Sequence, residues 1–372
     1  MIKKKTVCVV TSSRADYSHL YPLMLRLKES KKIQLKVVAT GMHLLKEYGE
    51  TYKLIEKDKF KINLRINSKQ KDTKASSILN GISNQIKQCS SFIKLKPSAV
   101  VLLGDRYDIF PFAIICHLYR IPIIHLHGGE TTSGSIDDQI RDSISLFSSI
   151  HFVAHKIFLD KLLRLGIKKN RIFNYGTIGL ESIRKIKKIS KSDVLAQIGM
   201  NSFSNYILVC VHPETTTKNN KSTIISILDS LKEFRDYGII FTGVNSDTES
   251  SFIRHSILKF VEKNSRCNYI ESAGREIYVN LLRSASLILG NSSSGVIEAP
   301  YLNTPTVNVG ERQNGRPMAS SIITVKANKT EIIKSIKKSL SSKSAKKYKN
   351  IYYSINKSSE RMIKKIEELL TN

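Results

Sequence analysis

The sequence predicts an α/β protein made of two doubly wound domains, each with a parallel sheet and helices on both faces. Short β-branched runs alternate with helical apolar spacing along the first half, and the alternation restarts after a basic, polar stretch at residues 182–192 that we expect to be a connection. The 372 residues suffice for two domains that each bury a core. Ligands of such domains bind at the carboxyl ends of the strands, so we expect the active site in the cleft between the domains.

Apolar spacing justifies the elements of the first half. The expected buried strands are short β-branched runs at residues 6–10, 35–39, 99–103, 121–125 and 150–154. Apolar side chains at helical spacing predict two amphipathic helices between them, over Leu20, Leu23, Met24 and Leu27 and over Ile78, Ile82 and Ile86.

The second half repeats the pattern. Its expected strands are at residues 206–211, 238–241, 287–290 and 306–309, with a helix over Ile224, Ile227, Leu228 and Leu231. A last amphipathic helix covers Met362, Ile366 and Leu369. We therefore expect a first domain at residues 1–176, a second at 177–355, and a C-terminal helix at 356–372 that packs back on the first domain.

Charge and composition limit the function classes. The 60 Lys and Arg against 31 Asp and Glu give a formal net charge of +29. Lys outnumbers Arg and the excess is spread along the chain, as on solvated faces, so we expect no nucleic-acid partner. The charge still favours long-range attraction of an anionic substrate. A non-enzymatic basic binding protein would share the charge but would not need polar clusters at strand ends.

Membrane and metal features are not expected. The longest uncharged apolar stretch, residues 109–116, is much shorter than the roughly 20 residues of a membrane span. The basic N-terminus lacks the long apolar region of a signal peptide, so we expect a cytoplasmic protein with no membrane partner. Five scattered cysteines without CxxC spacing, and no His/Cys cluster at ligand spacing, predict no metal site.

Polar residues follow the predicted strands of the first half. Arg14 lies after the first strand, where a guanidinium can bind phosphate bidentately, and the alternative is a surface pair with Asp16. This loop lacks GxGxxG, which argues against a nicotinamide enzyme. Asp105 follows Gly104 at another strand end and should project into the crevice, although Asp105 or Asp108 is also suited to cap a helix.

A denser cluster follows the strand at residues 121–125. His125 and His127 should share one side of an extended segment, by period two, with Glu130 close behind. Asp137 and Arg141 are four residues apart and should share one helix face. A helix cap and a salt bridge would explain any one of these residues. Their clustering beside another strand end favours acid/base chemistry.

The strand ends of the second half carry a different chemistry. His212 follows the strand at 206–211, where a loop histidine without chemistry is the plain alternative. The loop at 290–295 places Ser292 and Ser293 between glycines at the start of a helix that contains Glu298. Free backbone amides and the helix dipole there suit a diphosphate, whereas a plain N-cap would need one Ser.

Long motifs in a fixed order carry a family resemblance. They are TSSRADYSHLYPLM, TGMH, LLGDRYDIF, HLHGGETTSGSIDDQIR, GTIGLE, VHPETT, GNSSSGVIEAP and NVGERQNGR, which span most of residues 1–325. Together they resemble the UDP-N-acetylglucosamine 2-epimerase family, in its hydrolysing branch from bacterial sialic-acid-type biosynthesis. The resemblance implies two Rossmann-like domains in a GT-B-like fold and the reaction of UDP-N-acetylglucosamine with water to N-acetylmannosamine and UDP, through a 2-acetamidoglucal. It implies no metal or redox cofactor.

The resemblance also implies site residues. The catalytic candidates are Asp105, Glu130, Asp137, His127 and His212. The candidates for holding UDP are Arg14, His212, Asn245, Tyr278, Ser292, Ser293, Glu298 and Arg312, with Glu298 on the ribose hydroxyls. Non-hydrolysing relatives resemble HxEAG near His125, whereas this chain has His127 at the third position and its carboxylate at Glu130. Either residue therefore remains open as occupant of the catalytic position.

Alternatives within and beyond the branch stay open. A related hydrolysing enzyme would take UDP-2,4-diacetamido-2,4,6-trideoxyglucose, or a GDP-linked sugar, for legionaminic acid. A GT-B glycosyltransferase would use the same nucleotide loops but would not need three carboxylates at the first-domain strand ends. The substrate is a nucleotide-sugar in each case, and the family suggests a homodimer or homotetramer.

Overall fold

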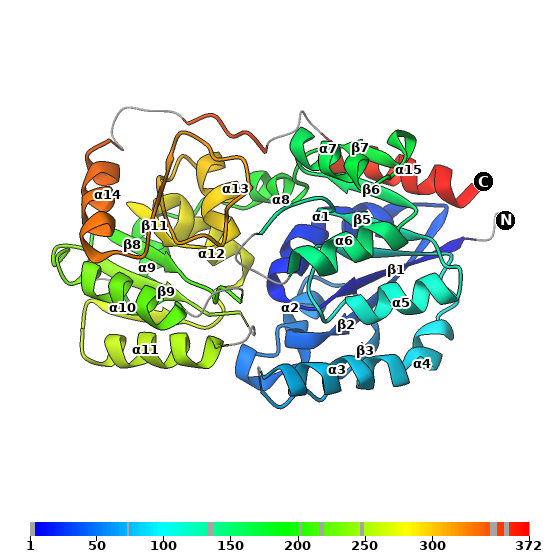
Figure 1. Ribbon diagram of the computed structural model, residues 1–372, viewed down its shortest axis with the longest axis horizontal. Coiled ribbons are helices and arrows are strands. Elements are labelled where there is room, and N and C mark those ends of the chain that lie inside the picture. Colours follow the sequence, from blue (N-terminus) through cyan, green and yellow to red (C-terminus); the bar gives the residue numbers. More distant parts are fainter. Residues whose placement is uncertain are drawn as a thin grey trace. The chain divides into compact units, whose positions relative to one another are not determined.

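Two compact units make up the protein. The computed structural model describes residues 4–72, 74–132, 137–200, 203–215, 219–245, 249–342, 348–352 and 357–371. The first unit contains residues 1–130, 137–185 and 352–372, and the second contains residues 131–136 and 186–351. Each unit has its own parallel sheet and its own cores, which confirms the predicted α/β class with two doubly wound sheets (Figure 1).

The first unit is built on a seven-stranded parallel sheet. In spatial order its strands are β3 (Ile62–Ile66), β2 (Ile33–Thr40), β1 (Lys5–Thr11), β4 (Ala99–Leu103), β5 (Ile123–Leu126), β6 (Ile150–Val153) and β7 (Ile172–Asn174). Alternate residues of β1 enter two separate cores: Val7 and Val9 face one, and Cys8 and Val10 face the other. Both faces of the sheet are therefore covered, as a parallel sheet requires.

Helices of the first unit cover the two faces of this sheet. They are α1 (Arg14–Glu29), α2 (Tyr52–Lys57), α3 (Ala75–Lys87), α4 (Cys89–Ile93), α5 (Phe110–Leu118), α6 (Asp137–Phe147), α7 (Lys156–Arg164), α8 (Gly179–Lys185) and α15 (Ser358–Thr371). Short 3₁₀ turns lie at Gly41–Leu44, Lys46–Tyr48 and Lys169–Arg171. Figure 1 shows α15, in red, among the elements of the first unit, where it packs on α1 through Met362 and Ile366.

The second unit repeats this design with a six-stranded parallel sheet. Its strands, in spatial order, are β10 (Cys267–Ile270), β9 (Gly238–Thr242), β8 (Tyr206–Cys210), β11 (Leu287–Gly290), β12 (Thr306–Val309) and β13 (Ile322–Val325). Its helices are α9 (Lys191–Ala196), α10 (Asn220–Leu231), α11 (Ser250–Glu262), α12 (Gly274–Ser284), α13 (Ser293–Tyr301) and α14 (Lys329–Ser342).

The connection between the units is shorter than the basic stretch at residues 182–192. Helix α8 continues to Lys185 and α9 begins at Lys191, so residues 186–190 join the two helices. Leu180 and Ile183 on α8 are buried where α8 packs against α1. That packing places α8 in the first unit, although the sequence suggested that a second domain begins at residue 177.

Strand order reverses once in each sheet. The reversal lies between β1 and β4 in the first unit and between β8 and β11 in the second. Connections leave these strand pairs toward opposite sides, which opens a crevice at their carboxyl ends. In the described part of the chain, no helix is both long and apolar enough to cross a bilayer.

Candidate functional site

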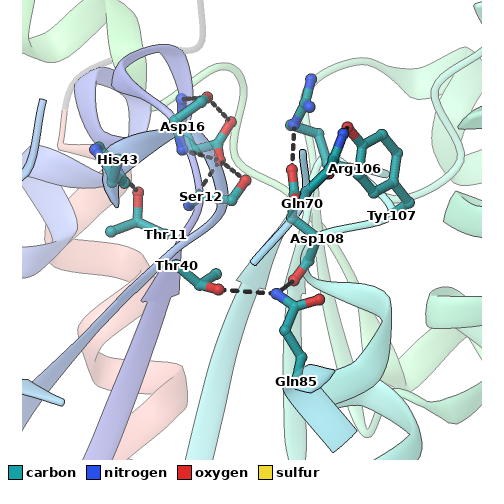
Figure 2. Close-up of polar contacts among 11 residues, drawn as sticks. Thr11, Ser12, Asp16, Thr40, His43, Gln70, Gln85, Arg106, Tyr107 and Asp108 are labelled. Carbon is teal, nitrogen blue, oxygen red and sulfur yellow. Dashed lines mark hydrogen bonds and ion pairs between the residues drawn. The ribbon is translucent and has the colours of Figure 1, made fainter. Parts of the chain in front are cut away.

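The loop after β1 is closed by hydrogen bonds to one buried carboxylate. Ser13 caps α1, and the Asp16 carboxylate accepts the backbone N–H groups of Ser12 and Ser13 at 3.1 and 3.0 Å (Figure 2). Both hydroxyls donate to the same carboxylate at 2.7 Å. These loop bonds, rather than a surface pair with Arg14, account for the burial of Asp16. The same hydrogen bonds fix the turn that precedes Arg14, the first residue of α1.

His43 fastens the neighbouring loop to β1. Its Nε2 lies 3.0 Å from the Thr11 hydroxyl and its Nδ1 lies 2.8 Å from the Thr51 hydroxyl (Figure 2 shows the contact with Thr11). Its backbone N–H donates to the Ser12 carbonyl at 3.1 Å. Burial lowers the pKa of His43 to about 4, while the nearby Asp16 carboxylate opposes that shift. The ring is therefore neutral near pH 7.

Asp105 and helix α6 are joined by an ion pair. The Arg141 guanidinium binds the Asp105 carboxylate, and its second nitrogen lies 3.3 Å from Asp138. Arg141 is buried, so it ties the first turn of α6 to the carboxyl end of β4. Asp137 begins this helix, where the helix dipole favours a negative charge. Asp137 and Arg141, which we expected on one helix, both lie on α6. The ion pairs of Arg141 include those with Asp105 and Asp138.

His127 and Glu130 form a buried pair after β5. The strand ends at Leu126, and His127 takes a left-handed backbone conformation with a φ of 62°. The expectation that His125 and His127 share one side of an extended segment is therefore wrong, because the chain turns at His127. The His127 Nδ1 lies 2.5 Å from the Glu130 carboxylate. The two candidates for one catalytic position are thus in direct contact, with the ring of His19 5.5 Å from that of His127.

The loop after β4 carries the buried carboxylate of Asp108. Arg106 Nε lies 3.1 Å from it, and the Gln85 amide donates to the Asp108 carbonyl at 2.9 Å (Figure 2). A Cβ on Gly41 would lie 2.8 Å from the Asp108 carboxyl carbon, so only glycine lets the two loops approach this closely. The same Gln85 amide reaches the Thr40 hydroxyl at 2.8 Å, which joins the loops after β2 and β4.

In the second unit, Asn291 bridges the loops after β8 and β11. Its side-chain oxygen accepts the His212 backbone N–H at 2.8 Å, and its amide donates to the His212 carbonyl at 2.9 Å. The Asn245 N–H donates to His212 Nδ1 at 3.3 Å, so a neutral ring carries its proton on Nε2. Gly290 precedes Asn291 with a φ of 131°, and a Cβ there would meet the Cys210 carbonyl oxygen.

Helix α13 begins at the expected small-residue loop. Ser292 is its N-cap and accepts the Ser294 N–H at 3.3 Å, so the plain capping interpretation holds for this residue. Tyr278 donates to the Ser294 hydroxyl at 2.6 Å, and Ser294 donates to Glu298 at 2.5 Å. Burial raises the pKa of Glu298, against the effect of the Ser294 hydrogen bond. Burial, then Cys210 and Glu298, raise the pKa of Tyr278.

The buried carboxylate of Glu214 supports the loop after β12. It accepts the backbone N–H groups of Glu311 and Arg312 at 2.9 and 3.1 Å. The Arg312 guanidinium lies 3.4 Å from the Asn291 carbonyl, and the Gln313 amide donates to that carbonyl at 2.7 Å. The expected residues His212 and Arg312 are therefore linked through Asn291.

The predicted site residues divide between the units. The first unit brings Asp105, Glu130 and His127 to the ends of adjacent strands β4 and β5, with Arg14 after β1 and Asp137 at the start of α6. The second unit gathers the rest at its own strand ends and on α12 and α13: His212, Asn245, Tyr278, Ser292, Ser293, Glu298 and Arg312. Sequence reasoning missed Asn291, Glu214 and Gln313, although each lies in a strand-end loop beside an expected residue.

Comparisons with known proteins assign the chain to a family. A family model described as UDP-N-acetylglucosamine 2-epimerase matches residues 25–367. The chain is 36% identical over 330 residues to a GDP/UDP-N,N'-diacetylbacillosamine 2-epimerase (hydrolyzing) of Campylobacter jejuni, covering 88% of this chain and 86% of the relative. It is 34% identical over 335 residues to a polysialic acid biosynthesis protein of Escherichia coli, covering 89% and 85%.

A solved structure shares the fold. The UDP-GlcNAc 2-epimerase of Methanocaldococcus jannaschii, in complex with UDP-GlcNAc and UDP, superposes with a TM-score of 0.82 at 20% identity. The alignment covers 98% of this chain and 99% of that one. At this identity the likeness establishes the fold alone.

Proposed function

Because the chain belongs to the UDP-N-acetylglucosamine 2-epimerase family, we propose that it is a hydrolysing epimerase of a UDP-linked 2-acetamido sugar. The observation that carries this proposal is the cluster of acid/base groups at the ends of β4 and β5. Asp105 is held there by Arg141, and Glu130 is paired with His127. Such a cluster suits proton removal from carbon followed by hydration of a double bond.

The proposed reaction has two steps, an elimination and a hydration. A base removes the proton at carbon 2 while the bond from carbon 1 to the UDP oxygen breaks and UDP leaves with that electron pair. The product of this elimination is a 2-acetamidoglucal. Water then adds its oxygen to carbon 1, and a proton is delivered to carbon 2 from the face opposite to the one that lost it. The free sugar is thus inverted at carbon 2.

Proton transfers are assigned to the first unit. Asp105, Glu130 and Asp137 are the carboxylates that we propose as acids and bases. His127 shares a proton position with Glu130 because its Nδ1 lies 2.5 Å from that carboxylate. The imidazole thereby gives Glu130 a partner that can accept or return a proton between the two steps.

UDP binding is assigned mainly to the second unit. Stabilising a departing diphosphate needs amide donors and cations, which the start of α13, His212 and Arg312 can supply. Glu298 is proposed to accept hydrogen bonds from the ribose hydroxyls, with Tyr278 and Asn245 beside the nucleotide. From the first unit, Arg14 is proposed as a further cation for the diphosphate.

Two sugars are candidates for the substrate. The relative at 36% identity is named for N,N'-diacetylbacillosamine, so we propose that 4-acetamido, 6-deoxy sugar first. UDP-N-acetylglucosamine is the second candidate, because the matching family model carries its name. The sugars differ only at carbons 4 and 6, away from the bonds that break, so the same residues would act on either.

The test is product analysis in deuterium oxide. The purified enzyme is given UDP-N,N'-diacetylbacillosamine, the GDP form of that sugar, or UDP-N-acetylglucosamine, and the released sugar is identified by NMR. We expect a free sugar with inverted configuration and deuterium at carbon 2. Retained configuration or an undeuterated product would refute elimination and revive the glycosyltransferase alternative.

A further inference from the structure

His125 has no part in the proposed chemistry, yet it contacts the three segments that carry the proposed acids and bases. It is inside β5 and fully buried, one residue from the end of the strand. Burying an imidazole costs free energy of folding unless its nitrogens are hydrogen-bonded.

Both ring nitrogens of His125 are bonded. Nε2 lies 2.8 Å from the Gly104 carbonyl oxygen, and Nδ1 lies 3.0 Å from the Ser145 hydroxyl. A carbonyl only accepts, so Nε2 carries the proton and the Ser145 hydroxyl donates to Nδ1. Burial lowers the pKa of His125 to about 4, so the ring stays neutral near pH 7 and keeps one tautomer.

These two bonds complete a closed circuit of contacts. Gly104 directly precedes Asp105, and Asp105 forms its ion pair with Arg141. Arg141 and Ser145 are one turn apart on α6. The Ser145 hydroxyl is hydrogen-bonded to His125, and His125 is hydrogen-bonded to the Gly104 carbonyl oxygen. A shift of α6 or of the end of β4 would therefore stretch several of these contacts at once.

The loop with the His127–Glu130 pair also rests on this circuit. A Cβ on Gly128 would lie 2.9 Å from His125 Nδ1 and 3.0 Å from the Ser145 hydroxyl. The backbone between His127 and Glu130 thus packs directly on the hydrogen bond between His125 and Ser145. The ring of His125 contacts all three segments that carry the proposed acids and bases.

We propose that His125 is a positioning residue of the epimerase. Through Gly104 and Ser145 it keeps the Asp105 carboxylate, α6 and the loop at residues 127–130 in the geometry that elimination needs. This inference rests on the proposed function, because it concerns the same site. Such positioning acts on turnover, since a displacement of about 1 Å at reacting groups can cost roughly 10²-fold in rate.

A matched control lies on the neighbouring strand. His151 in β6 is also fully buried, and its ring centroid lies 6.2 Å from that of His125. Its ring takes no part in the hydrogen bonds that join His125 to Gly104 and Ser145. His125→Leu and His151→Leu therefore delete the same side chain from the same sheet. Only His125→Leu removes the hydrogen bonds to Gly104 and Ser145.

The experiment compares wild type, His125→Leu, His125→Gln, Ser145→Ala and His151→Leu by kcat, KM, UDP affinity and thermal unfolding. We expect His125→Leu to lower kcat by roughly 10²-fold and Ser145→Ala by about tenfold, with UDP affinity within about threefold. His125→Gln, whose amide can still reach the Gly104 carbonyl, should recover about tenfold of the loss. His151→Leu should keep kcat within about threefold.

The pH profile separates positioning from direct proton transfer. Because the ring of His125 does not titrate near pH 7, His125→Gln should lower kcat without removing a limb of the wild-type profile. Loss of a limb would overturn the inference in favour of an acid/base role. Ser145→Ala changes one hydroxyl and tests the circuit even if His125→Leu does not fold.

Other outcomes also decide the question. An active wild type with near-normal kcat in both His125→Gln and Ser145→Ala would overturn the positioning role alone. Equal losses of kcat in His151→Leu and His125→Leu would do the same, because they would report stability. A wild type that releases no sugar inverted at carbon 2 would instead overturn the proposed function together with this inference.

Discussion

We expect Glu214 to stabilise the second unit, because its buried carboxylate accepts two backbone hydrogen bonds from the loop after β12. The residue is 7% exposed, and one oxygen of its carboxylate accepts the N–H groups of Glu311 and Arg312 at 2.9 and 3.1 Å. Gly310 packs against that oxygen so closely that a Cβ would lie 2.3 Å from it. Little room is left for a water molecule to replace a lost acceptor.

The magnitude follows from the two bonds. Glu214→Gln keeps the shape but loses the charge. A hydrogen bond to a charged group is worth about 1.5–3 kcal/mol against about 0.5–1.5 for a neutral one, so two bonds lose roughly 2–3 kcal/mol. Glu214→Ala removes both charged hydrogen bonds, at about 1.5–3 kcal/mol each, and should cost more.

Calorimetry measures both consequences. For a unit of this size, the change in Glu214→Gln corresponds to a fall in Tm of roughly 4–12 °C. UDP affinity should also fall, because the loop that carries Arg312 loses its support. Glu233→Gln is the matched control, since Glu233 lies in the same unit and its side chain is 53% exposed beside Lys329. A Tm and a UDP affinity in Glu214→Gln equal to those of this control would refute the reasoning.

The remaining predictions concern the nucleotide site, the acid/base cluster and pH. Ser292→Ala with Ser293→Ala should weaken UDP binding by several-fold or more in titration calorimetry, because hydrogen bonds to the diphosphate charge are lost. Asp105→Asn and Asp137→Asn should each lower turnover by at least ~10²-fold while UDP still binds. The pKa of His43 is about 4 in the folded chain and 6.5 for an exposed histidine, so unfolding takes up a proton between these values. Stability should fall as pH drops from 6.5 to 4, and His43→Gln should flatten that dependence in urea titrations.

Matched controls exist for each of these changes. Ser222→Ala removes an exposed hydroxyl of the same unit and should leave UDP affinity unchanged. Asp229→Asn removes an exposed carboxylate and should keep turnover. His255→Gln replaces an exposed histidine and should keep the wild-type pH dependence. Unchanged UDP affinity in the double Ser variant would place the diphosphate site elsewhere. Near-normal rates in both Asn variants would move the chemistry to Glu130, His127 or His212, and parallel pH curves for His43→Gln and wild type would contradict the third prediction.

Central strands were predictable and edge strands were not. The apolar runs at residues 6–10, 99–103, 206–211 and 287–290 become β1, β4, β8 and β11, which lie inside the sheets and are mostly buried on both faces. The missed strands β3, β7, β10 and β13 all lie at sheet edges and are largely half-exposed. A strand buried on both faces must be apolar throughout, whereas an edge strand carries no such requirement, so only the former leaves a clear pattern.

The candidate site divides in the same way. Strand ends are local features, so the sequence alone located Asp105, Glu130, His212 and the serines at the start of α13. It also determined the fold class, because apolar periodicity is local. Contacts between distant segments were decided only by the tertiary structure: Arg141 with Asp105, Asn291 across two loops, and α15 on α1. The physical reason is that these contacts depend on which strands become neighbours. Strand order is set by the packing of the whole sheet, and no single segment encodes it.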